Sequence, residues 1–154
     1  MPIYFVDTSA LAKRYVNEPG SAWLRALLNP TTGAETLIVR IAAVELIAAI
    51  TRRERGGSVS LADAAAARAA VRSDLAAEYQ VVEVTEALIG RAMSLAEAHG
   101  VRGYDAVQLA AALEVNALLV AGALPPLLLV SADSELNAAA TAEGLAIEDP
   151  NAHP

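Results

Sequence analysis

The 154-residue chain contains no cysteine, two histidines and a single lysine, Lys13. The absence of cysteine excludes disulfide bonds, thiolate metal ligands, iron–sulfur clusters and a cysteine nucleophile. Ten of the eleven basic residues are arginines, which leaves almost no room for a lysine-dependent mechanism. Neither histidine is placed as a metal ligand or a general base, because His99 precedes a helix-ending glycine and His153 lies in the C-terminal tail.

Positive charge and long hydrophobic runs are also scarce. Eleven Lys and Arg against eighteen Asp and Glu give a net charge of −7. Proteins that bind nucleic acid through overall charge are usually basic, so any such role must depend on a local site. The longest apolar stretch, residues 117–130, is broken by Gly122 and Pro125-Pro126 and is too short to cross a bilayer. With no secretory leader, we expect a cytoplasmic protein that does not associate with membranes.

The sequence does have the apolar content of one folded domain. Hydrophobic residues make up 55% of the chain and the mean hydropathy is +0.41, which excludes intrinsic disorder. We assign residues 1–148 to a single domain and residues 149–154 to a short C-terminal tail, which we expect to be frayed.

Short β-prone runs alternate with helix-prone segments along this domain. The alternation predicts an α/β fold with a central, mostly parallel, twisted sheet of four or five strands flanked by helices. The helices on either side of Gly56-Gly57 are expected to form a protruding antiparallel pair. No glycine-rich phosphate loop occurs, so no dinucleotide cofactor is expected. Expected strands cover residues 3–6, 36–39, 80–84, 127–130 and 145–147, and expected helices cover 10–15, 21–29, 41–55, 60–79, 86–99, 103–115 and 134–143.

Four acidic residues follow strands or open helices. Asp7 follows the first strand, Glu45 lies early in the helix after the second, Asp105 opens the helix before the fourth strand, and Asp133 follows that strand. Ligands of a parallel sheet bind beyond the carboxyl ends of its strands, so we expect these side chains to converge on one rim. Two carboxylates about 5 Å apart repel by roughly 3 kcal/mol at an effective dielectric near 20, which favours a bound cation. Ligation by oxygen alone favours a hard ion, Mg²⁺ or Mn²⁺.

Each of these residues also has a structural alternative. Asp7, Asp105 and Asp133 stand where an aspartate commonly caps a helix. Glu45 could be a solvated helix residue, but its neighbours are apolar nearly all round the helix, and a buried glutamate needs a partner. Ser9 fits a contact to a metal-bound water or a helix cap.

Arg52 lies seven residues after Glu45 and therefore on roughly the same helix face. It fits a phosphate contact near the acids, and it fits equally well a solvated cation at a helix C-terminus.

Four segments of the chain contain the four acids in a fixed order. They are Val6-Asp7-Thr8-Ser9-Ala10-Leu11, Ala43-Val44-Glu45-Leu46 followed by Arg52, Arg102-Gly103-Tyr104-Asp105-Ala106-Val107-Gln108-Leu109-Ala110, and Leu129-Val130-Ser131-Ala132-Asp133-Ser134-Glu135-Leu136. Together, in order and spacing and over almost the whole chain, they resemble the PIN-domain nucleases, and among these the small VapC-type toxins of bacterial toxin–antitoxin pairs.

This resemblance implies a PIN-like domain with Mg²⁺-dependent endoribonuclease activity, in which Mn²⁺ is a substitute ion. It implies a homodimer that a VapB-type antitoxin holds inactive, with RNA as the substrate. Asp7, Glu45, Asp105 and Asp133 become the acidic site, with Asp7 and Asp105 the most direct metal ligands. One departure is Gln108, which stands where many relatives have histidine and to which we assign no chemistry.

Three alternatives remain open at this stage. A haloacid-dehalogenase-like phosphatase would need a second aspartate where this chain has Ser9, and a lysine near the fourth strand. A receiver-like signalling domain would need an acidic pair in the first loop and a lysine after the last strand. The third alternative is a catalytically inactive PIN fold that only binds RNA or protein.

Overall fold

The computed structural model describes all 154 residues and contains one five-stranded sheet. Its strands are β1 (Ile3–Val6), β2 (Glu35–Val39), β3 (Tyr79–Val82), β4 (Leu128–Val130) and β5 (Ala146–Glu148). They are ordered β3-β2-β1-β4-β5, and every neighbouring pair is parallel. Phe5 of the central strand pairs with Leu37 on one side and Leu129 on the other, and all three side chains are buried in the core.

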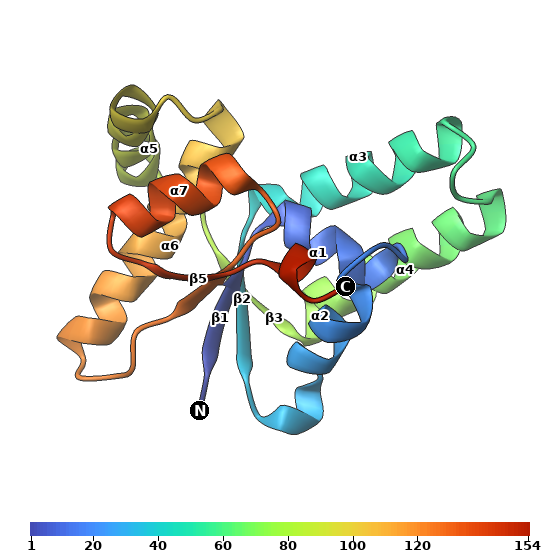
Figure 1. Ribbon diagram of the computed structural model, residues 1–154, viewed down its shortest axis with the longest axis horizontal. Coiled ribbons are helices and arrows are strands. Elements are labelled where there is room, and N and C mark those ends of the chain that lie inside the picture. The colour runs from blue at the N-terminus through green and yellow to red at the C-terminus, as the bar shows by residue number, and fades with distance from the viewer.

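Seven helices cover the two faces of this sheet (Figure 1). The first four lie on one face of the sheet and the last three on the other. This is expected, because β2 and β3 extend the sheet from one edge of β1 whereas β4 and β5 extend it from the other edge. The helices are α1 (Thr8–Tyr15), α2 (Ser21–Leu27), α3 (Ile41–Arg55), α4 (Leu61–Ala77), α5 (Glu86–His99), α6 (Gly103–Ala121) and α7 (Ser134–Ala142), and two short 3₁₀ turns are η1 (Pro30–Thr32) and η2 (Pro150–Ala152).

The chain reverses its winding at β1 and β4, which lie side by side in the centre of the sheet. Such a switch point leaves a crevice beyond the carboxyl ends of the two strands. Asp7 follows the last residue of β1, and Asp133 lies three residues after the end of β4. The topology therefore brings two of the four predicted acids to the same crevice.

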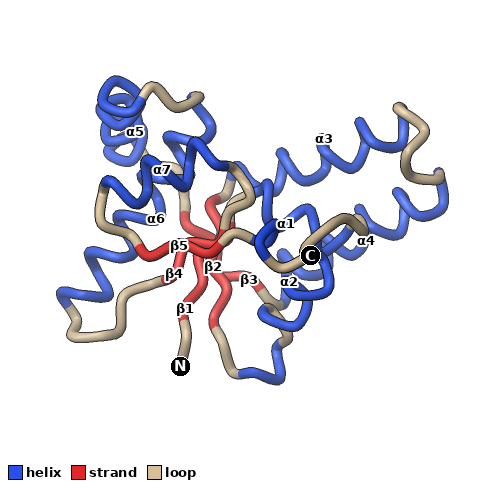
Figure 2. The backbone as a smooth tube through the Cα atoms, viewed as in Figure 1, coloured by secondary structure: helices blue, strands red, loops and turns tan.

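Helices α3 and α4 form an antiparallel arm that extends beyond the rest of the domain (Figures 1 and 2). The turn between them contains Gly57 at φ 78°, a left-handed conformation that glycine adopts without strain. Ser60 then caps α4 by accepting a hydrogen bond from the backbone N–H of Asp63 at 3.0 Å. The protruding helix pair expected from the sequence is therefore confirmed.

The C-terminal tail is ordered, so the expectation that it is frayed is wrong. Asp149 caps η2 by accepting from the N–H of Asn151 at 2.8 Å, and Pro150 is buried. The ring of His153 stacks on Trp23 with 4.2 Å between centroids. The tail also explains Gly20, because a Cβ atom there would lie 2.3 Å from the carbonyl oxygen of Pro150.

Helix α6 continues to Ala121, six residues beyond its predicted end, because no helix-breaking residue occurs before Gly122. It is the one helix long and apolar enough to cross a membrane by length and composition. Seven of its residues are buried, and the helix contacts α5, α7 and β2. The buried residues lie between Ala106 and Leu113, so the first half of α6 is a core helix, whereas Leu118 and Val120 near its end are exposed.

Candidate active site

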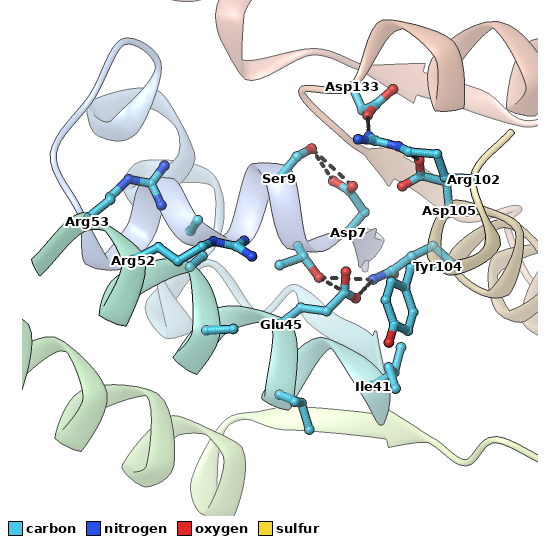
Figure 3. Close-up of a pocket in the computed structure, with 16 residues that line it drawn as sticks. Asp7, Ser9, Ile41, Glu45, Arg52, Arg53, Arg102, Tyr104, Asp105 and Asp133 are labelled. Carbon is cyan, nitrogen blue, oxygen red and sulfur yellow. Dashed lines mark hydrogen bonds and ion pairs between the residues drawn. The ribbon is translucent and has the colours of Figure 1, made fainter. Parts of the chain in front are cut away.

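A cleft of about 620 Å³ lies beyond the carboxyl ends of the central strands (Figure 3). Its walls come from α1, α3, α6 and the loop after β4, which are far apart in the sequence. All four predicted acids line it. The sixteen lining residues are Asp7, Thr8, Ser9, Ala12, Ile41, Val44, Glu45, Ala48, Ala49, Arg52, Arg53, Arg102, Tyr104, Asp105, Gln108 and Asp133.

Asp7 is the most deeply buried of the four acids, with 2% of its surface exposed. Its carboxylate accepts from the Ser9 hydroxyl at 2.8 and 3.0 Å and from the N–H of Ala10 at 3.2 Å, so it also caps α1. These donors are neutral, and no cationic side chain forms an ion pair with Asp7. Burial therefore raises the pKa of Asp7 to about 7, and the hydrogen bonds offset only part of that shift.

Ser9 connects Asp7 to the opposite side of the cleft. While its hydroxyl donates to Asp7, its oxygen accepts from the N–H of Ala132 at 3.0 Å. The N–H of Ala132 belongs to the loop that leads to Asp133. Ser9 thus fixes the spacing between the end of β1 and the loop after β4.

Glu45 projects from α3 into the cleft and is partly buried. Its Oε1 accepts from the Thr8 hydroxyl at 3.0 Å and from Nε2 of Gln108 at 3.1 Å. Burial raises the pKa of Glu45 above its usual value, and the two hydrogen bonds act in the opposite direction. The solvated-residue alternative is therefore wrong for Glu45.

Asp105 and Asp133 share one cationic partner, Arg102. The guanidinium donates through Nε to Asp105 at 3.0 Å and through Nη2 to Asp133 at 2.7 Å. Burial raises the pKa of Asp105, Arg102 lowers it, and the charge of Asp133 raises it again. The Arg102 side chain is 73% exposed, so the bridge lies at the mouth of the cleft.

The capping alternative holds for two of the three aspartates. Asp133 caps α7 by accepting from the N–H groups of Glu135 and Leu136 at 2.9 and 3.0 Å, as Asp7 caps α1. It is wrong for Asp105, which lies inside the first turn of α6, since the N-cap position is Arg102. Capping and a functional role are therefore compatible at Asp7 and Asp133.

No three of the acids lie close enough to form a ready cluster for one ion. Like charges without a cation repel, and Arg102 already binds Oδ2 of Asp105 and Oδ2 of Asp133. The donor set nevertheless suits a hard divalent cation, since it consists of carboxylates and hydroxyls with no sulfur or imidazole. Asp7 in particular is a buried carboxylate without a counter-charge.

Arginines and one aromatic ring line the outer part of the cleft. Arg52 is exposed and makes no ion pair, whereas the neighbouring Arg53 pairs with Glu18 at 3.2 Å. Figure 3 shows the Arg52 side chain extending from α3 into the cleft, between Ser9 and Glu45. Tyr104 lies on the opposite wall and is 60% exposed.

Sequence reasoning missed three polar contributors to this site. Thr8 and Gln108 hold Glu45, and Arg102 bridges the other two acids. Gln108 carried a usable signal, because it is a single polar residue in an otherwise apolar stretch three positions after Asp105. Arg102 and Thr8 carried none beyond their proximity to acids in the sequence.

The fold and cleft define a class of protein: an α/β enzyme with carboxylates gathered at the switch point of a parallel sheet. The PIN domain family matches residues 4–141 of the chain. Ribonuclease VapC45 and Ribonuclease VapC49, from two strains of Mycobacterium tuberculosis, are each 35% identical over 116 residues, which is 75% of this chain and 78% of each relative. The chain therefore belongs to the PIN-domain family and, within it, to the VapC-type toxin ribonucleases.

Solved structures share the same architecture at lower identity. PAE2754 from Pyrobaculum aerophilum has a TM-score of 0.63 and 24% identity, covering 98% of this chain and 85% of its own. VapC20 from M. tuberculosis, described as a toxin that cleaves the sarcin–ricin loop, has a TM-score of 0.62 and 20% identity, covering 98% and 99%. VapBC-1 from nontypeable Haemophilus influenzae has a TM-score of 0.60 and 16% identity, covering 96% and 98%.

These matches confirm the expected single α/β domain of the PIN type and the ribonuclease assignment. They also make the phosphatase and receiver alternatives wrong. Nucleases of this family generally depend on a divalent metal ion.

Proposed function

We propose that this cleft hydrolyses internal phosphodiester bonds of RNA with Mg²⁺, or Mn²⁺ in its place, bound by carboxylates. The observation that carries the proposal is the meeting of four carboxylates from four segments of the chain in one cleft with exposed arginines at its mouth. The acids suit a divalent cation, and the arginines suit the phosphates of an RNA backbone. The cleft therefore offers binding groups for both the metal ion and the substrate.

Asp7 and Asp105 would hold the cation most directly, with Asp133 and Glu45 completing the acidic set. A divalent cation, when bound, supplies a Lewis acid for the phosphate oxygens and promotes ionisation of water. Asp7 gains most from a cation, because its buried carboxylate otherwise has only neutral donors. Ser9 keeps that carboxylate oriented.

Glu45 would accept a proton from the attacking water through Oε2. Its other oxygen, Oε1, already accepts from Thr8 and Gln108, while no hydrogen bond is made by Oε2. Burial raises the pKa of Glu45, which makes its carboxylate a better proton acceptor than an ordinary glutamate near neutral pH.

RNA contacts would come from the two sides of the mouth of the cleft. Arg52 has no acidic partner within the chain, so its guanidinium is available to a phosphate oxygen. The exposed ring of Tyr104 can stack on a base, which is how proteins commonly hold single-stranded RNA. The overall negative charge of the chain makes these local contacts necessary.

A VapB-type antitoxin is the proposed inhibitor. A largely apolar groove of about 590 Å³ runs between α3 and α4, and Val44, Ala48 and Arg52 line both this groove and the acid cleft. A flexible antitoxin segment in the groove could therefore extend an Arg or Lys side chain to the acids. One of the structural neighbours is named VapBC-1, a name that joins a VapB and a VapC component. An RNA substrate and an antitoxin partner would both fit the cytoplasmic location expected from the sequence.

A homodimer is the proposed assembly. Helix α5 exposes an apolar surface on which Ile89 and Met93 are 40% and 64% exposed. Burial of such a surface between two copies would leave each copy with its own cleft. Light scattering of wild type and Met93→Glu tests this, and an unchanged dimer in the variant would place the interface elsewhere.

The nuclease assignment is tested with purified protein and end-labelled RNA. We expect cleavage with Mg²⁺, none with EDTA, and none for Asp7→Asn. Addition of the protein encoded by the adjacent gene should suppress cleavage if that gene encodes the antitoxin. Binding of that protein without any fall in the cleavage rate would contradict occlusion of the acid cleft. RNA binding without cleavage would favour the inactive-PIN alternative.

A further inference from the structure

Gln108 is the single polar side chain among the buried residues of α6. It is 1% exposed, and the other buried residues of the helix are alanines and leucines. Burial of a polar amide is unfavourable unless hydrogen bonds compensate for lost hydration. The contacts of Gln108 therefore require an explanation.

The amide nitrogen of Gln108 makes two hydrogen bonds, to Thr8 Oγ1 at 3.0 Å and to Glu45 Oε1 at 3.1 Å. Thr8 in turn donates to Glu45 Oε1 at 3.0 Å. Because the Thr8 oxygen accepts from Gln108, its hydroxyl proton is directed to Glu45. The three side chains form a closed ring that joins α6, α1 and α3.

This ring fixes one face of the Glu45 carboxylate. Both donors end on Oε1, and Oε2 receives no hydrogen bond from the chain. A glutamate on a helix surface otherwise samples several side-chain rotamers, and ordering it costs entropy. The ring therefore holds Glu45 with Oε2 as the oxygen that remains for the cleft.

Stability alone does not account for Gln108. Its own Oε1 is buried and has no hydrogen-bond partner, which is unfavourable for folding. A leucine would fill a similar volume and would leave no buried polar atom without a hydrogen-bond partner. The reverse orientation of the amide is disfavoured, because it would direct Gln108 Oε1 at a carboxylate oxygen of Glu45.

We propose that Gln108 is a positioning residue of the nuclease reaction, which acts by holding Glu45 with Oε2 directed at the attacking water. This inference rests on the proposed function of the cleft. Gln108 itself touches neither water nor phosphate in the reaction. Its contribution is the orientation of another side chain, as with the outer-shell partners that hold metal ligands.

The first test compares two variants on the same helix. Gln108→Leu should lower kcat for RNA about 10- to 100-fold with little change in KM, while Tm stays equal or rises. Asn116→Leu is the matched control, because Asn116 also makes a side-chain hydrogen bond, to the N–H of Leu127 at 3.1 Å, but lies outside the cleft. This control should lower Tm and leave kcat unchanged. A fall of Tm with unchanged kcat in Gln108→Leu would overturn the proposal.

A double-mutant cycle separates positioning from a general structural role. Single-turnover rates, with enzyme in excess, are measured for Gln108→Leu, Glu45→Gln and the double variant. If Gln108 acts through Glu45, the leucine should have no further effect in the Glu45→Gln background. Equal losses in both backgrounds would overturn the proposal. Gln108→His, which keeps a ring N–H donor, should recover part of the rate.

The same data distinguish failure of this inference from failure of the proposed function. A wild-type protein that cleaves no RNA with Mg²⁺ would refute the nuclease assignment itself. If Asp7→Asn is inactive but Glu45→Gln cleaves at the wild-type rate, the nuclease assignment stands and the positioning role of Gln108 falls.

Discussion

The cleft contains two pairs of acids that the protein stabilises in different ways. The inner pair, Asp7 and Glu45, is held only by neutral donors from α1 and α6. The outer pair, Asp105 and Asp133, is held by the exposed guanidinium of Arg102. The inner pair is therefore fixed in orientation but left without compensating charge, whereas the outer pair already has a cation.

This difference suggests separate roles for the two pairs of acids. Neutral donors orient a carboxylate without neutralising it, so the inner pair remains available to the proposed cation. An exposed arginine neutralises two carboxylates but is easily displaced, because it lies in water at the mouth of the cleft. The carboxylates of the inner pair are thus held in fixed orientations. At the outer pair, the proposed metal ion would replace the guanidinium of Arg102.

One substitution in each pair gives the largest expected effect. Asp7→Asn and Asp105→Asn should each lower RNA cleavage by at least about 1,000-fold, because each removes the charge of a carboxylate proposed to hold the metal. The far-UV circular dichroism should stay that of the wild type. An unchanged cleavage pattern in both variants would show that the RNA is cut by a contaminant.

The inner pair should also limit the stability of the metal-free protein at high pH. The folded-state pKa of Asp7 is raised from 3.8 to about 7, so folding favours the protonated form and stability falls as pH rises through this window. Asp7→Asn should therefore raise the free energy of unfolding by about 2–4 kcal/mol at pH 8, with EDTA present, and have little effect at pH 4. Urea denaturation at both pH values measures this, and an equal gain at both would contradict it.

The outer pair should bind a cation more tightly once Arg102 is removed. Arg102→Ala is expected to increase Mn²⁺ affinity about 10-fold, because the ion no longer has to displace a guanidinium from two carboxylates. Arg52→Ala is the matched control, since it removes the same charge from the same cleft but breaks no ion pair. Electron paramagnetic resonance of free Mn²⁺ gives both affinities. Weaker binding in Arg102→Ala would mean that the arginine organises the acids for the metal.

The smallest expected effect is that of Arg52 on the substrate. Arg52→Ala should raise KM for RNA about 3-fold at low salt and have no effect at high salt, because a phosphate contact is screened by added ions. The affinity for Mn²⁺ should hardly change. A fall in kcat at constant KM would instead place Arg52 at the reacting phosphate.

Much of the fold could be predicted because its signals are local. Alternating β-prone and helix-prone runs gave the strand and helix order, and Ser60 and Gly57 marked the two ends of the turn in the α3–α4 arm. Helix and strand ends were less accurate, as with α6, since local propensity does not say where tertiary contacts cease. The tail was misjudged because its order depends on Trp23 and Gly20, more than a hundred residues away.

The candidate acids could be predicted from their positions after strands and at helix starts. The contacts of Asp7 with Ser9 and Ala10 are local, so the sequence carries them. The partners of Glu45 are Thr8, 37 residues before it, and Gln108, 63 residues after it, and no local pattern connects the three. The one available sign was that Gln108 is the single polar residue in the apolar stretch 106–113.

By itself, the sequence determined the α/β class, the order of elements, the four acids and their shared edge of the sheet. Those properties follow from periodicity, capping residues and the geometry of parallel strands, which act over a few residues or over whole elements. Only the tertiary structure decided that Asp7 and Glu45 are held by neutral donors while Arg102 bridges Asp105 and Asp133. Burial and hydrogen bonding depend on which side chains from distant segments meet, and these contacts set the charge and orientation of each acid.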